Sequence, residues 1–169
     1  MVLTKPELIA SLQNEVRILL HLAGKIDPAT LDYRPTPKQR STIELLQYLS
    51  MMGPELVSGA AAGKFDETAW TAAEKAAAAR TFDETIAVIA AQHDRYAALL
   101  ADVSDADLRV EIDPFGAGKS SMGAFLVNHV LCGCAAYRTQ LFLYLKACGR
   151  AELNTWNLWV GIDEPAAAK

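Results

Sequence analysis

The chain has 169 residues and a mass of 18.3 kDa, which predicts a single domain over residues 1–150 and a C-terminal tail over residues 151–169. Hydrophobic residues make up 51% of the sequence and charged residues 21%, so the composition supplies a core and excludes a globally disordered chain. A net charge of −4, with basic residues scattered along the sequence, argues against nucleic acid and against an anionic membrane as partners.

The N-terminal sequence and the cysteine content indicate a cytoplasmic protein. Residues 1–6 lack the basic run and apolar core of a signal peptide, and no later stretch offers about 18 consecutive apolar residues. Three cysteines cannot all pair with one another, so we expect reduced thiols.

The first predicted helix covers residues 5–25, because apolar side chains recur there at spacings of three and four. Its His21 lies off the apolar stripe, so we expect an exposed imidazole. Prolines at positions 28, 35 and 37 then predict a loop, since each proline favours extended geometry in the residue before it.

Two capping boxes predict the starts of the second and third long helices. In each box, a hydroxyl at Ser41 or Thr81 can accept from the backbone N–H three residues later, and the glutamate at that position reaches back. The helix after Ser41 should kink or break at Gly53–Pro54, because proline cannot donate to the preceding turn. The next long helix, residues 82–103, places His93 on its apolar stripe.

The remaining segments complete an all-α prediction. Alanine-rich residues 68–80 predict a short connecting helix, and residues 108–112 alternate in polarity as in one strand of a short β-hairpin. A last long helix is expected over residues 122–148, ended by Gly149. Four long amphipathic segments without a strong sheet signal predict a four-helix bundle with a long crossover connection between its second and third helices.

Two motifs that look like ligand sites have simpler explanations. Residues 116–121 lack the first glycine of a phosphate-binding loop, because that position is Asp113, and they predict a glycine-rich turn. Cys132 and Cys134 are two residues apart in a predicted helix, so they point about 200° away from each other and cannot close on one metal ion.

One face of the predicted last helix carries polar groups toward the bundle interior. His129, Gly133 and Tyr137 follow one another at spacings of four residues, and Gln140 comes less than one turn later. Buried polar groups need hydrogen-bond partners. This face therefore either bonds to itself and to water or lines a pocket.

Two stretches of the sequence resemble the DinB/YfiT-like superfamily of four-helix-bundle proteins. Residues 31–49 are similar to the family's entry into its second helix. Residues 128–149, with Arg138 and Gln140, are similar to its last helix, which usually reads H-x-x-x-H-R-G-Q. The resemblance implies a DinB-like bundle, often a homodimer, with a divalent nickel or zinc ion held by three histidines. Its characterised relatives include thiol-dependent transferases, an isomerase and metal-dependent hydrolases.

The matching positions in this sequence lack the family's metal ligands. The resemblance places those ligands at Tyr48, Gly133 and Tyr137, and none of the three is histidine. Neutral tyrosines are poor ligands for zinc or nickel at pH 7, so we expect no metal cofactor. Nickel or zinc would require a rebuilt site that uses His93 and His129 with a carboxylate or a tyrosine.

Three functions remain open. In the first, the bundle binds a small organic molecule in a pocket; the candidate residues are Tyr48, His93, His129, Gly133, Tyr137 and Gln140. In the second, the chain is an enzyme like the family's thiol transferases or hydrolases, with or without metal, and His129 or His93 serves as the general base. In the third, the last helix and the Trp156–Trp159 tail form the interface of a homodimer.

Overall fold

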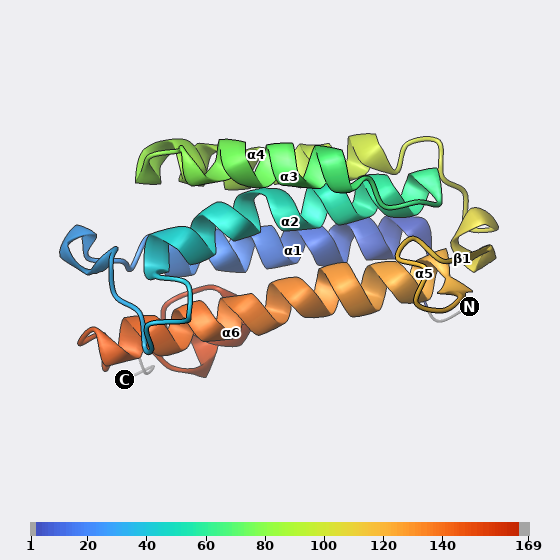
Figure 1. The fold of residues 1–169 in the computed structure, drawn as a ribbon. Coiled ribbons are helices and arrows are strands. Elements are labelled where there is room, and N and C mark those ends of the chain that lie inside the picture. The colour runs from blue at the N-terminus through green and yellow to red at the C-terminus, as the bar shows by residue number, and fades with distance from the viewer. Residues whose placement is uncertain (1–2, 166–169) are drawn as a thin grey trace.

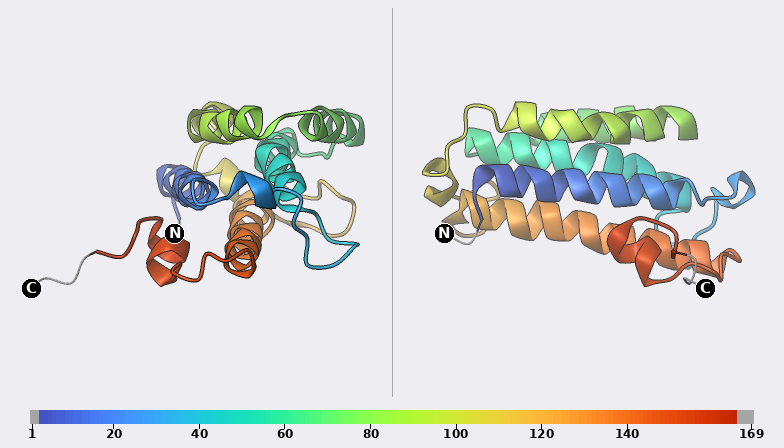
Figure 2. Two further views of the ribbon diagram at one scale, coloured as in Figure 1. Left: turned by 90° about the vertical axis from the view of Figure 1, so that its left-hand side faces the viewer. Right: turned by 180° about the vertical axis from the view of Figure 1, so that it is seen from behind.

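Four long helices pack side by side in the computed structural model, which describes residues 3–165 (Figure 1). They are α1 (Lys5–Ala23), α2 (Thr42–Ala62), α4 (Phe82–Leu99) and α6 (Cys132–Ala147). Helices α4 and α6 each contact both α1 and α2, whereas α1 and α2 lie diagonally opposite each other (Figure 2). The predicted all-α bundle is confirmed. Within residues 3–165, no helix combines the length and the apolarity that crossing a membrane requires.

The predicted long crossover joins α2 to α4. The chain turns back after α2, forms α3 (Glu67–Ala78) and turns again, so that α2 and α4 run in the same direction (Figure 1). Helix α3 lies outside the four-helix core and packs on α2. The Gln47 side chain of α2 holds the end of α3, because its Nε2 donates to the carbonyl oxygens of Ala78 and Arg80 at 3.3 and 2.8 Å.

Capping boxes begin three of the helices. At the start of α2, Ser41 accepts from the backbone N–H of Glu44, and the Glu44 carboxylate accepts from the backbone N–H of Ser41 at 2.8 Å. The predicted box at Thr81 is also present, and Thr4 begins α1 in the same way. Each box satisfies backbone N–H groups that the first helical turn leaves without partners.

Helix α2 continues through Pro54, so the expectation of a break at Gly53–Pro54 is wrong, whereas the alternative of a kink there stays a prediction. Gly53 and Pro54 are both buried, and the Tyr96 hydroxyl of α4 occupies the space that a side chain on Gly53 would need. Gln92 of α4 donates to the backbone carbonyl of Leu49 at 2.9 Å. Tertiary contacts of this kind can offset the roughly 3 kcal/mol that proline costs inside a helix.

A short β-hairpin precedes the last helix, as predicted. The 3₁₀ turn η2 (Asp107–Arg109) leads into β1 (Glu111–Ile112), which pairs antiparallel with β2 (Ser120–Ser121). In the connecting turn the Asp113 carboxylate accepts from the backbone N–H groups of Ala117 and Gly118. This closed turn agrees with the prediction for the glycine-rich segment.

The last long helix changes its winding near its start. Helix α5 (Met122–Phe125) continues through the π-helical turn η3 (Leu126–Leu131) into α6. A π-helical turn holds more residues than an α-helical turn, so it rotates the residues before it relative to those after it. Residues of η3 therefore do not share a face with α6 at the spacing of four that the sequence suggested.

The C-terminal segment packs against α1 of its own bundle. Its short π-helical turn η4 (Trp156–Val160) contacts α1, and the Arg17 guanidinium donates to the carbonyl oxygens of Val160 and Gly161 at 2.6 and 3.1 Å. Arg138 of α6 donates to the Leu158 carbonyl. The segment is thus held by side chains from both α1 and α6.

His21 belongs to this contact, so the expectation of an exposed imidazole is wrong. Only 17% of its side chain is exposed, and Asn157 lies against it, with 3.1 Å between Asn157 Nδ2 and His21 Nε2. The apolar periodicity of α1 identifies only the side chains that pack inside the bundle. His21 lies on another face of α1, which the C-terminal segment covers.

Candidate functional site

Tyr48 on α2 and Tyr137 on α6 meet between the two helices. Their ring centroids are 5.2 Å apart and their planes are inclined by 69°, which is an edge-to-face contact. Trp70 of α3 also packs edge-on against Tyr48, with centroids 6.2 Å apart. The Arg40 guanidinium carbon lies 3.8 Å from the centroid of the Tyr48 ring, within the range of a cation–π contact. The structure thus joins two of the predicted site residues in a half-buried aromatic cluster.

The electrostatics of this cluster keep Tyr48 protonated near neutral pH. Burial, followed by the neighbouring Tyr137 phenol, raises the pKa of Tyr48 to about 12, while the Arg40 guanidinium acts in the opposite direction. A neutral phenol can donate and accept hydrogen bonds but is a poor ligand for a divalent cation.

Gly133 lies beside the tyrosine pair, and a methionine approaches the space next to it. The terminal methyl carbon of Met52 would be 3.5 Å from a Cβ placed on Gly133, which is ordinary van der Waals contact. Across residues 3–165, no three His, Cys, Asp or Glu side chains gather in a group that could hold a metal ion. Two phenols and a glycine do not fit zinc or nickel.

The two other predicted imidazoles lie away from the tyrosine pair on the surface. The His93 side chain is 56% exposed and bonds Asp94 at 2.8 Å, so the expectation that His93 faces the core is wrong. The buried face of α4 passes through Gln92 instead, since that side chain finds a partner in the Leu49 carbonyl. Because Gln92 is polar, the apolar pattern does not identify it as a core residue. The same pattern placed its neighbour His93 in the core instead.

His129 is exposed and packs against two aromatic rings near the hairpin, tilted against Phe125 and edge-on against Phe115. Its ring centroid lies 4.6 Å from that of Phe125 and 5.9 Å from that of Phe115. The π-helical turn η3 contains His129, which is why it does not continue the face of Gly133 and Tyr137.

Gln140 takes part in a structural contact one turn before Tyr144. The Gln140 amide donates to the Tyr144 hydroxyl, which in turn donates to the backbone carbonyl of Arg40 at 2.9 Å. This chain of hydrogen bonds ties α6 to the loop before α2. It supplies the partner that the Gln140 side chain requires.

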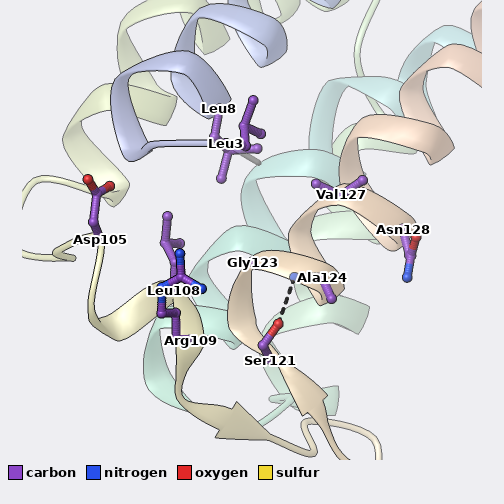
Figure 3. A pocket seen from close by; sticks show the side chains of 10 residues that line it. All are labelled: Leu3, Leu8, Asp105, Leu108, Arg109, Ser121, Gly123, Ala124, Val127 and Asn128. Carbon is purple, nitrogen blue, oxygen red and sulfur yellow. Dashed lines mark hydrogen bonds between the residues drawn. The ribbon is translucent and has the colours of Figure 1, made fainter. Parts of the chain in front are cut away.

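A separate cavity lies at the end of the bundle where α1 begins (Figure 3). Its volume is about 540 Å³, within the range of small-molecule sites. Its walls come from the start of α1, from η2 and from the α5–η3 segment, and they consist of Leu3, Leu8, Leu108, Gly123, Ala124 and Val127. Gly123 allows these segments to approach closely, because a Cβ there would lie 3.0 Å from the Leu108 carbonyl oxygen.

Four polar side chains also line this cavity: Asp105, Arg109, Ser121 and Asn128. The Asp105 carboxylate accepts from the backbone N–H of Lys5 at 2.6 Å, and Ser121 Oγ accepts from the backbone N–H of Ala124 at 3.3 Å. The Arg109 guanidinium and the Asn128 carboxamide form no hydrogen bond with any other part of residues 3–165. Sequence reasoning missed this cavity because its walls come from segments far apart in the chain, and none of them carries a recognisable motif.

Comparison with known proteins gives a consistent result. The family model described as the DinB superfamily matches residues 11–130. The crystal structure of a DinB-like protein from Bacillus subtilis is similar to this fold with a TM-score of 0.66, at 18% sequence identity, over 87% of this chain and 95% of that chain. At this identity the likeness concerns the fold alone. No curated protein matches the chain significantly.

Proposed function

This chain belongs to the DinB superfamily, and from that premise we propose that it binds a small organic molecule without a resident metal ion, in the cavity at the end of the bundle. The observation that carries the proposal is the cavity itself, a space of about 540 Å³ with apolar walls and a few polar side chains. Such a combination is typical of small-molecule sites, where the apolar surface supplies affinity and the polar groups fix orientation.

The tyrosine pair supports the metal-free part of this proposal. Tyr48 and Tyr137 stand where the family resemblance implies ligands, and they contact each other, with Trp70 packed against Tyr48 and Met52 close to Gly133. We therefore assign binding to the end cavity. The pocket predicted around Tyr48 and Tyr137 stays a prediction.

A cavity-filling variant tests this function. Ala124 lines the cavity, so Ala124→Phe should fill part of it, whereas Ala136→Phe places the same ring on the exposed side of α6. We expect thermal-shift screening of small organic acids, alcohols and amines in the presence of EDTA to find compounds that stabilise the wild type and Ala136→Phe. Binding to the native state raises the melting temperature, and the stabilisation grows with the logarithm of the ligand concentration once this exceeds Kd. Equal stabilisation of Ala124→Phe would overturn the assignment of binding to this cavity.

A further inference from the structure

We infer that the end cavity takes a small organic monocarboxylate, with the hydrocarbon part inside the apolar walls and the carboxylate at Arg109. The inference rests on the proposed function and names the ligand class of the same cavity. It is supported by the apolar lining, by the hydrogen-bonding groups left without partners and by the position of Arg109 next to the β-hairpin.

The walls suit a hydrocarbon body larger than a single ring. Four aliphatic side chains face the space, Leu3, Leu8, Leu108 and Val127. A buried apolar cavity of about 150 Å³ can hold benzene, and this cavity has a volume of about 540 Å³. An alkyl or aryl chain several carbons longer than benzene therefore has room, and transfer of its surface from water drives binding.

The polar atoms left without partners around the cavity are mainly donors. The Arg109 guanidinium carries five N–H groups and the Asn128 carboxamide two. Both residues line the cavity and are exposed, and neither side chain has a hydrogen-bond partner within residues 3–165, so these donors face water and are available to a ligand. The Ser121 oxygen already accepts from Ala124, which leaves its O–H free to donate. An acceptor-rich, negatively charged group complements this set, and a charge-assisted hydrogen bond to guanidinium is stronger than a neutral one.

The acidic side chain at the cavity does not favour a cationic ligand. Asp105 accepts from the backbone N–H of Lys5 at 2.6 Å, and the Lys5 ammonium group lies nearby, where it donates to the carbonyl oxygens of Leu100 and Ala101. The Asp105 charge is thus already opposed by local donors. A ligand cation would also have to approach the unpaired Arg109 guanidinium.

The hairpin brings Arg109 and Ser121 to one side of the cavity. The backbone carbonyl of Val110 accepts from the N–H of Met122 at 2.9 Å, and in the antiparallel register Ser121 pairs with Glu111, two residues after Arg109. Arg109 and Ser121 therefore lie diagonally across the two arms of the hairpin. Figure 3 shows both on the side of the β1–β2 ladder, with Leu3 and Leu8 on the far side. A carboxylate beside Arg109 can extend its hydrocarbon part from this side toward those leucines.

Three ligands of equal length test the inference: octanoate, octanol and octylammonium. Isothermal titration calorimetry at neutral pH with EDTA should show octanoate binding most tightly to the wild type and octylammonium most weakly. Arg109→Gln should weaken octanoate binding about tenfold and leave octanol binding unchanged, because it removes the charge and keeps the polar side chain. Arg95→Gln is the matched control, since Arg95 is an exposed arginine of α4 outside the cavity. Circular dichroism should show the same helix content in both variants.

The outcomes separate this inference from the proposed function. If octanol and octanoate bind equally and Arg109→Gln changes neither, the carboxylate class is wrong, although the cavity still binds a small molecule. If octylammonium binds most tightly, the assignment of charge is wrong. If none of the three binds to the wild type and the broader screen finds nothing that Ala124→Phe abolishes, both the inference and the proposed function fail.

Discussion

Tyr48 of α2 and Tyr137 of α6 touch edge to face, 5.2 Å between ring centroids, at two of the three positions where the family resemblance implies metal ligands. The third position, Gly133, has no side chain, and Met52 lies close to it. The scaffold that brings these positions together is intact, since α2 and α6 pack as neighbours. Where the resemblance implies a ligand set, the structure places an aromatic contact between two helices.

Introducing histidine at all three positions should create affinity for a metal ion. We expect the variant Tyr48→His/Gly133→His/Tyr137→His, purified without a histidine tag, to bind about one equivalent of nickel or zinc, because imidazole suits both ions. A side chain at position 133 would start in ordinary contact with Met52, which can move aside because methionine is flexible. Elemental analysis measures the metal content, and added nickel should raise the melting temperature of this variant.

The single variant Tyr48→His is the control for metal binding and should hold no stoichiometric metal. The wild type should likewise contain far less than one equivalent. A full equivalent of transition metal in the wild type would contradict our account of the site. A triple variant that folds but binds no metal would show that these three positions do not converge as the family resemblance implies.

Alkaline conditions should weaken the fold through its buried tyrosines. Burial raises the pKa of Tyr48 to about 12, with a further contribution from Tyr137, and burial also raises the pKa of Tyr96. A raised pKa in the folded state means that the unfolded chain loses the phenolic proton first. The free energy of unfolding is therefore fully maintained below about pH 10 and falls as pH rises toward 12.

Urea unfolding followed between pH 8 and pH 11.5 measures this slope. Tyr48→Phe removes the ionisable group and keeps the ring, so its unfolding free energy should depend less steeply on pH than that of the wild type. Ultraviolet titration near 295 nm gives an independent measurement, because Tyr48 should ionise late in the folded protein and near pH 10 after unfolding in guanidinium. Identical slopes for both proteins would mean that Tyr48 ionises as freely in the native state as in the unfolded state.

Mild acid should loosen the C-terminal segment at His21. Burial lowers the pKa of His21, Lys25 and Arg17 lower it further, and Asp163 acts in the opposite direction. A histidine whose pKa is lowered on folding contributes stability above its unfolded value of about 6.5, and that stability is lost as pH falls through the folded pKa. We expect faster hydrogen exchange at the amides of Leu158 and Ile162 at pH 5 than at pH 7, after correction for the intrinsic exchange rate.

Two variants separate titration of His21 from general loosening of the segment. His21→Gln can still accept from Asn157 and does not titrate, so it should reduce the pH dependence of exchange. Asn157→Ala removes a buried amide that bonds His21, Asp163 and the Ile162 carbonyl, and should cost about 1–3 kcal/mol at any pH. If His21→Gln shows the same pH dependence as the wild type, the acid effect belongs to another group, and Asp163 becomes the first candidate because it pairs with Lys25.

The sequence predicted the parts of this fold that depend on local chemistry. The boxes at Ser41 and Thr81 begin helices as expected, since a cap needs residues only three positions apart. Whether the helix continues through Pro54, and whether His93 faces the core, depends instead on contacts from distant segments. The side-chain direction of His129 depends on a π-helical turn. No pattern in a single helix contains that information.

The same distinction applies to the candidate site. The resemblance led to Tyr48 and Tyr137, which the structure brings together, because corresponding positions of a shared fold stay together. The end cavity could not be read from the sequence, since its walls are single residues from several separate segments. The expected homodimer depends on surfaces of a second copy and stays a prediction.

Substitution by alanine should lower the free energy of unfolding at one glycine of the bundle and not at another. At Gly53, the Tyr96 hydroxyl occupies the place of a Cβ, and Tyr96 is fully buried, so it cannot swing away. Gly53→Ala should therefore cost about 1–3 kcal/mol, the usual cost of overpacking a core. At Gly133, a Cβ would meet Met52 at 3.5 Å, so Gly133→Ala should be neutral or stabilise the helix by roughly 0.5–1 kcal/mol.

The double variant Gly53→Ala/Tyr96→Phe identifies the cause. Removing the hydroxyl takes away the closest atom, so urea unfolding should show that Gly53→Ala costs less in the Tyr96→Phe background than in the wild type. The partners of the Tyr96 hydroxyl are weak, a long hydrogen bond of 3.4 Å to Gln92 and the Cys134 thiol, so Tyr96→Phe alone should cost little. An equal cost of Gly53→Ala in both backgrounds would mean that its effect comes from the α2 backbone next to Pro54. In that case position 53 would require glycine because of Pro54 and not because of Tyr96.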